Sequence, residues 1–168
     1  ALRLVEALGT VRLRSDVERK RLYGVQAADQ QGHLNAGIYS QDASTATYQR
    51  LHQLAEHALL AGFPVVIDAT YLKQAQREAA WQIAEATGVP FLILDCHAPD
   101  AVLDQWLAQR QAEGGDPSDA TQEVIRAQQA GRDPLSEQEQ SRSRRIDTHD
   151  AGSLDSLVEA IRQHLPGV

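Results

Sequence analysis

Residues 64–68 are Pro-Val-Val-Ile-Asp, and residues 90–95 are Pro-Phe-Leu-Ile-Leu-Asp. Each is a short apolar run that ends in a carboxylate, and a continuous apolar run is typical of a strand buried on both faces. Helical periodicity follows each run, over residues 73–87 and residues 99–110. Buried strands that alternate with helices predict an α/β fold with a mainly parallel sheet.

The sequence on either side continues this pattern. Apolar spacing predicts strands at residues 10–14 and 145–148, and helices at residues 1–8, 17–23, 45–60 and 154–165. A capping box, Ser-Glu-Gln-Glu, begins one more helix at Ser136. Residues 25–44 show no clear period, and we expect an irregular excursion there.

Length and composition exclude several classes of protein. A chain of 168 residues has the usual size of one domain, and we expect one domain over residues 1–168. Its net charge of −7 opposes binding to a long nucleic acid, which needs many basic contacts. No run of about 18 apolar residues offers a membrane span. The one cysteine excludes an internal disulfide and favours a reducing, cytoplasmic setting.

The carboxyl ends of the predicted strands point to a site. Ligands of open parallel sheets bind beyond these ends. Asp16 follows the first strand, with Arg19 three residues later on a helix. Such a carboxylate can accept a proton from a hydroxyl while the arginine holds an anion. The alternative is a solvated basic helix with weak ion pairs.

The run that ends at Asp68 has the form of a Walker B strand. An aspartate in this position can hold Mg²⁺ directly or through water. Thr70 and Arg77 follow on the next loop and helix. Both are able to reach a bound phosphate or a substrate hydroxyl, although the Walker B pattern alone is common and weak.

Together, four stretches resemble the P-loop kinase-like proteins of the AAA family. They are residues 14–19 (Arg-Ser-Asp-Val-Glu-Arg), residues 66–70 (Val-Ile-Asp-Ala-Thr) with Arg77, residues 94–99 (Leu-Asp-Cys-His-Ala-Pro) and residues 110–119. This group is similar to zeta toxins, chloramphenicol phosphotransferase and polynucleotide 5′-hydroxyl kinases. The chain looks most like the kinase-like domain fused to aminoglycoside-phosphotransferase-like domains, which implies such a domain as a fused or associated partner.

The resemblance implies roles for individual residues. It makes Asp16 the general base, with Arg19 as its partner, and it places Asp68 near the metal and the substrate. Substrate-binding positions are Arg14, Asp68, Thr70 and Arg77. The resemblance makes Arg110, at the start of a lid over about residues 110–136, a catalytic position that also binds the ATP phosphates. Either Arg132 or the cluster Arg142-Ser143-Arg144-Arg145 would substitute for a second lid arginine, and Asp147 and Thr148 are nucleotide-binding positions near the adenine.

A phosphate-binding G-x-x-x-x-G-K-[ST] motif does not occur in the sequence. The resemblance places this motif, and a central strand before it, immediately ahead of Ala1. Without that strand, the strands ending at Asp68 and Asp95 would each present an unpaired edge, which is costly. We therefore expect a three-layer P-loop kinase-like domain that lacks its central strand here, the alternative being a truncated or degenerate domain.

The sequence thus predicts an ATP-dependent phosphotransferase. The expected reaction transfers the γ-phosphoryl group of ATP to a hydroxyl of a small molecule, with Mg²⁺ as cofactor and residues 25–44 in the acceptor pocket. Two alternatives stay open. One is an ATP hydrolase or nucleotide switch that does not need Asp16. The other is a non-catalytic regulatory module of a larger fused protein.

Overall fold

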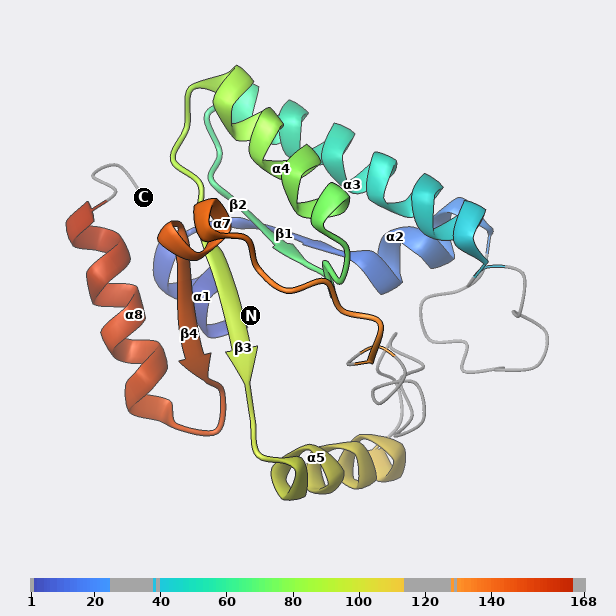
Figure 1. The fold of residues 1–168 in the computed structure, drawn as a ribbon, viewed down its shortest axis with the longest axis vertical. Coiled ribbons are helices and arrows are strands. Elements are labelled where there is room, and N and C mark those ends of the chain that lie inside the picture. The colour runs from blue at the N-terminus through green and yellow to red at the C-terminus, as the bar shows by residue number, and fades with distance from the viewer. Residues whose placement is uncertain (1, 25–37, 39, 114–127, 129, 165–168) are drawn as a thin grey trace.

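The computed structural model describes residues 2–24, 38, 40–113, 128 and 130–164 (Figure 1). Its elements are, in order, α1 (Leu2–Leu8), β1 (Val11–Arg14), α2 (Ser15–Leu22), α3 (Gln41–Leu60), β2 (Val65–Asp68), α4 (Gln74–Thr87), β3 (Ile93–His97), α5 (Asp100–Glu113), α7 (Glu137–Ser141), β4 (Ser143–Asp147) and α8 (Ala151–His164). In this part of the chain, no helix has both the length and the apolar character that crossing a membrane requires.

All of the described strands are parallel to their partners, as the sequence predicts. β1 pairs with β2, from Val11 opposite Val65 to Arg14 opposite Asp68. β3 pairs with β4, from Ile93 opposite Ser143. The described strands form two sheets of two strands each instead of one sheet, because β2 and β3 make no ladder with each other. The α/β class is confirmed, with its parallel strands divided between two sheets.

Each sheet has its own apolar cluster. The first cluster lies between β1, β2 and α3, and its buried members are Leu13, Tyr48, Leu51 and Ala55. The second cluster lies between α1, β4 and α8, and its buried members are Leu4, Leu8, Ile146, Leu157 and Ile161. Figure 1 shows α3 and α4 on the side of β1 and β2, with α8 beside β4. The core of the described chain is therefore divided between the two sheets.

Helix caps explain where several helices begin. The Ser40 hydroxyl accepts a hydrogen bond from the Ala43 N–H, so α3 starts at Gln41, four residues before the expected start. The prediction of irregular structure is therefore wrong for residues 41–44, whereas residues 25–37 and 39 lie outside the described part. The predicted capping box is confirmed, because the side chains of Ser136 and Glu139 cap each other's backbone.

An extended segment at residues 131–136, which we call the strap, leads into α7 and runs past the loop that joins β2 to α4. Lys73 Nζ donates to the Gly131 carbonyl over 2.7 Å and to Asp133 Oδ1 over 3.1 Å. The Asp133 N–H donates to the Leu72 carbonyl, and Asp133 Oδ2 accepts from the Gln74 N–H. These bonds fix the strap to the first sheet's side of the molecule.

Candidate functional site

The carboxyl ends of β1 and β2 coincide. Arg14 and Asp68 are the last residues of their strands and lie opposite each other in the parallel register. Asp16 lies in the first turn of α2, two residues beyond Arg14, and is half-buried. The structure thus brings Asp16 and Asp68 to the same edge of one sheet, where open parallel sheets bind their ligands.

Two arginines of β1 surround the Asp68 carboxylate. Arg12 donates from Nε over 3.0 Å and also from Nη2, both to Asp68 Oδ2. Arg14 Nε lies 4.0 Å from the same oxygen. The sequence analysis missed Arg12, although the alternation of valine, arginine, leucine and arginine in β1 places both arginines on one face of the strand.

These contacts bear on the predicted magnesium site. Asp68 Oδ2 is engaged by guanidinium groups, whose positive charge opposes the approach of a divalent cation. Among the described residues, no group of three or more His, Cys, Asp or Glu side chains could hold a metal ion. Mg²⁺ that accompanies a nucleotide is held mainly by phosphates and water with one or two carboxylates, so the assignment of Asp68 to magnesium stays a prediction.

Arg19 contacts the protein itself. Its side chain is buried, and Nη1 donates to the Ile38 carbonyl over 2.8 Å. The same nitrogen lies 3.4 Å from Ser44 Oγ. Because Ser44 is in the first turns of α3, these bonds fix α2, and with it Asp16, against α3.

Beyond Asp68, the chain enters a cluster of aromatic and polar side chains. The Tyr48 hydroxyl lies 3.2 Å from Thr70 Oγ1 and accepts a hydrogen bond from the Tyr71 N–H. The Tyr71 hydroxyl lies 3.2 Å from His52 Nε2. Burial raises the pKa of Tyr71 and lowers the pKa of His52, so both side chains are neutral near pH 7. Of this cluster, sequence reasoning found Thr70 alone.

Arg77 is buried and is bonded to three parts of the chain. It is 4% exposed, and it donates to the Tyr71 carbonyl over 3.0 Å and to the Pro134 carbonyl over 3.2 Å. Its Nε and Nη2 reach the two carboxylate oxygens of Glu139, over 2.5 and 3.2 Å. The hydrogen bond from Arg77 lowers the pKa of Glu139 despite burial. Arg77 therefore joins the loop after β2 to the strap and to α7.

The carboxyl end of β3 carries a second network. Asp95 accepts hydrogen bonds from Arg132 Nη2 over 2.5 Å and lies 2.9 Å from His97 Nε2. Burial raises the pKa of Asp95, but the bonds from His97 and Arg132 together outweigh it and leave the pKa lowered. Arg145 Nη2 lies 3.3 Å from His97 Nδ1, and since arginine only donates, the proton of a neutral His97 resides on Nε2.

Asp147 and Thr148 occupy the end of β4. The Thr148 N–H and hydroxyl both donate to the His97 carbonyl, over 2.8 and 2.9 Å, and so close the end of the second sheet. Asp147 Oδ1 lies 2.5 Å from His149 Nδ1, and this hydrogen bond lowers the pKa of Asp147. The side chain of Arg110 lies outside the described part of the chain.

A family model described as AAA domain matches residues 1–135. The chain belongs to the AAA domain family. This is a P-loop family, and its members generally bind nucleotides. The match includes β1, β2 and β3 and ends within the strap, before α7. The AAA domain matches no curated protein at a significant level of sequence similarity.

Solved structures share the fold of this AAA domain and are described as kinases. A candidate kinase from Chloroflexus aurantiacus has 17% identity and a TM-score of 0.65, over 96% of this chain and 88% of that one. A sugar kinase from a Janibacter species has 14% identity and a TM-score of 0.61, over 95% and 82%. A gluconokinase from Sinorhizobium meliloti has 17% identity and a TM-score of 0.58, over 96% and 86%. The AAA domain therefore has a P-loop kinase-like fold.

Proposed function

We propose that this AAA domain is the core of a kinase that transfers the γ-phosphoryl group of ATP to a hydroxyl of a small molecule. The observation that carries the proposal is the register of β1 and β2, which sets Arg14 beside Asp68 with Asp16 immediately beyond. Phosphoryl transfer to a hydroxyl uses a carboxylate that takes the proton and positive charge that balances the phosphates. Both kinds of group meet at this edge.

The acceptor side of the proposed site consists of Asp16, Arg14 and Thr70. Asp16 accepts the proton of the acceptor hydroxyl as that oxygen attacks the phosphorus atom. Arg14 and the exposed Thr70 hydroxyl bind the acceptor. Arg19 holds Asp16 in place through α3, and Arg77 holds the loop that carries Thr70.

The nucleotide side of the proposed site lies toward the second sheet. Arg132 reaches Asp95 in the middle of β3, and we assign it, with Arg110 of α5, to the phosphates of ATP. Asp147 and Thr148, at the end of β4, are assigned to the region of the adenine. Asp68 is assigned to ordering Arg12 and Arg14, which surround its carboxylate.

The burial of the strands supports the proposal that one more strand lies between β2 and β3. The residues of β2 are all half-buried, whereas Leu13 of β1 and Ile146 of β4 are buried. In the first sheet, β2 is thus less buried than β1, although the inner strands of a complete parallel sheet are the more buried. We infer that a further strand pairs with β2 and β3 and continues into a phosphate-binding loop. The 168 residues contain no G-x-x-x-x-G-K motif of their own.

The kinases of similar fold suggest which acceptors to test first. One neighbouring structure is described as a sugar kinase and another as a gluconokinase. We therefore propose sugars and sugar acids as the first class of acceptor. A domain that resembles aminoglycoside phosphotransferases remains the proposed fused or associated partner.

Calorimetric titration with Mg·ATP tests the nucleotide part of the proposal. The 168-residue chain is compared with a longer protein that carries its native upstream residues. We expect binding by the longer protein and at least a hundredfold weaker binding by the 168-residue chain, because the phosphate cradle supplies most contacts to ATP. If neither protein binds Mg·ATP, the kinase proposal and the alternative of an ATP hydrolase or nucleotide switch are both wrong, and a non-catalytic module is favoured.

Asp16→Asn tests the catalytic part. In the longer protein, we expect it to lower phosphoryl transfer to a sugar or sugar acid by about 10²–10⁴-fold, because general base catalysis contributes that much. Asp155→Asn is the matched control, since Asp155 is exposed on α8. If Asp16→Asn leaves ATP turnover intact and no acceptor is phosphorylated, the protein is an ATP hydrolase or a nucleotide switch.

A further inference from the structure

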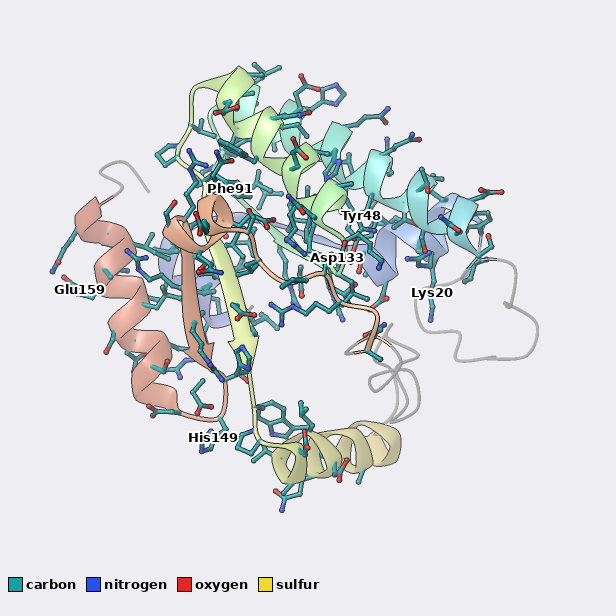
Figure 2. All side chains as sticks on the ribbon, viewed as in Figure 1. Lys20, Tyr48, Phe91, Asp133, His149 and Glu159 are labelled. Carbon is teal, nitrogen blue, oxygen red and sulfur yellow. The ribbon has the colours of Figure 1, made fainter. Side chains whose placement is uncertain are left out.

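A buried phenol contacts an exposed hydroxyl at the end of β2. Tyr48, on α3 and labelled in Figure 2, is buried, and its hydroxyl oxygen lies 3.2 Å from Thr70 Oγ1. The Tyr71 backbone N–H donates to the same phenol oxygen over 3.0 Å. Thr70 is exposed and follows Asp68 by two residues. A residue of the first apolar cluster thus reaches the edge of the proposed acceptor site.

The hydrogen bonds of Tyr48 set the direction in which Thr70 donates. A phenol has one proton, and the Tyr48 oxygen already accepts from the Tyr71 N–H. In the described part of the chain, Thr70 Oγ1 is the other hydrogen-bond partner of the Tyr48 hydroxyl. Because a buried hydroxyl proton needs an acceptor, the Tyr48 phenol donates its proton to Thr70 Oγ1. Thr70 then directs its own proton elsewhere. No acceptor for that proton is found among the described residues.

The backbone of Tyr71, whose N–H binds Tyr48, is itself in a strained conformation. Its φ of +44° lies in the left-handed region, which residues other than glycine rarely adopt. Three contacts maintain it: the N–H bond to Tyr48, the hydroxyl contact with His52 Nε2, and the carbonyl bond from Arg77 Nη1. Strain that the surroundings enforce is concentrated at binding and catalytic sites, where it fixes a geometry in advance.

We propose that Tyr48 is a positioning residue that orients the Thr70 hydroxyl as a hydrogen-bond donor to an oxygen of the acceptor. This inference rests on the proposed function and assigns its acceptor site a feature of specificity. The ligand is an oxygen-rich small molecule, and the atom that meets Thr70 is a hydroxyl or carboxylate oxygen. Tyr48 acts through Thr70 and the Tyr71 backbone and does not itself contact the acceptor.

Binding of D-glucose and D-gluconate to the full-length protein tests this inference without ATP. The variants are Tyr48→Phe, which keeps the ring, and Thr70→Val, which keeps the shape of the side chain. We expect each to weaken binding of the probe that the wild type binds by about 3–10-fold, the effect of one hydrogen bond. The double variant should lose no more than Thr70→Val alone, because Tyr48 acts through Thr70.

Two further variants separate positioning from damage to the fold. Thr70→Ser keeps the donor and should bind the probe as the wild type does. Tyr23→Phe is the matched control, since Tyr23 is exposed at the end of α2, and it should change nothing. In steady-state assays with Mg·ATP, Tyr48→Phe should raise the KM for the acceptor and leave the KM for ATP unchanged, a split that a merely structural role would not give.

The outcomes distinguish this inference from the proposed function. Unchanged probe binding by Tyr48→Phe, or a further loss in the double variant, would overturn the positioning role while leaving the kinase proposal intact. Failure of the wild type to bind either probe would also overturn it. Failure to bind Mg·ATP, with probe binding sensitive to Tyr48 and Thr70, would overturn the kinase proposal and leave the acceptor site in place.

Discussion

The two halves of the molecule are built alike but differ in where their charges lie. The first half comprises β1, β2, α2, α3 and α4, and the second comprises β3, β4, α1 and α8. Each has a two-stranded parallel sheet and an apolar cluster. In the first half, Arg12 and Asp68 pair between strands while partly buried. In the second half, Arg3–Asp155 is exposed, whereas Asp95 of β3 is partly buried where it pairs with His97 and Arg132.

The burial of these pairs indicates which charged groups the fold holds in place. Partly buried charges that are fully paired are costly to separate, whereas exposed ion pairs contribute little. Both halves therefore hold a paired carboxylate in place, Asp68 on β2 and Asp95 on β3. The strap joins the halves, because Arg77 bonds to Pro134 and Glu139 while Arg132 reaches across to Asp95. A site that extends over both halves depends on this connection.

Breaking the connection should have the largest effect. We expect Arg77→Met to lower the free energy of unfolding by about 3–5 kcal/mol, because it leaves the Glu139 carboxylate without its buried partner. Urea unfolding measures this loss. Lys73→Met is the matched control, since the Lys73–Asp133 pair of the strap is exposed and its loss should lower the free energy of unfolding much less. Equal losses in the two variants would contradict a connection through Arg77.

A core substitution in each half should have the next largest effect. Leu51→Ala in the first cluster and Leu157→Ala in the second should each cost about 2–5 kcal/mol, because each leaves a cavity. Since the sheets make no common ladder, hydrogen exchange should increase first in the half that carries the substitution. A uniform increase over both halves would show that they unfold as one unit.

The smallest expected effect concerns pH. The hydrogen bond from Arg77 lowers the pKa of Glu139 below its ordinary value of 4.5, so the fold binds this proton less readily than the unfolded chain. The stabilisation is therefore present above about pH 4.5 and is lost as the pH falls through the lowered pKa.

Unfolding measured between pH 7 and acid should show this loss. In Glu139→Gln, the free energy of unfolding should fall less steeply with decreasing pH than in the wild type. Asp147→Asn should change this pH dependence less, because the Asp147–His149 pair is exposed. If the free energy of unfolding depends on pH equally in the two variants, the buried Arg77–Glu139 pair does not dominate the loss of stability in acid.

Local patterns explain how much of the fold was predicted. The apolar run before Asp68 corresponds to β2, and the capping box at Ser136 begins α7. The run over residues 90–95 found β3 with shifted bounds, because the strand begins at Ile93 and continues past Asp95 to His97. These features depend on near neighbours in the chain, which a sequence shows directly. The start of α3 was missed because Ser40 and Ala43 lie in a stretch without apolar periodicity, where the cap was the one available signal.

The candidate site was predicted less completely, for a physical reason. The carboxylates at strand ends were found, because a strand ends where polarity begins. The hydrogen-bond partners of the charged side chains were not predicted, because Arg12 and Asp68 are 56 positions apart and Arg77 and Glu139 are 62 positions apart. Arg77 and Arg19 were predicted as site residues, and the structure shows both to be buried and to donate to backbone carbonyls.

The sequence alone determined the order of strands and helices, the acidic strand ends and the absence of a phosphate-binding motif within its 168 residues. Tertiary structure decided that Asp68 is held by Arg12, that Arg77 links the strap, and that Tyr48 stands behind Thr70. The reason is that backbone periodicity follows from adjacent residues, whereas the partner of a buried polar group is decided when distant elements pack together.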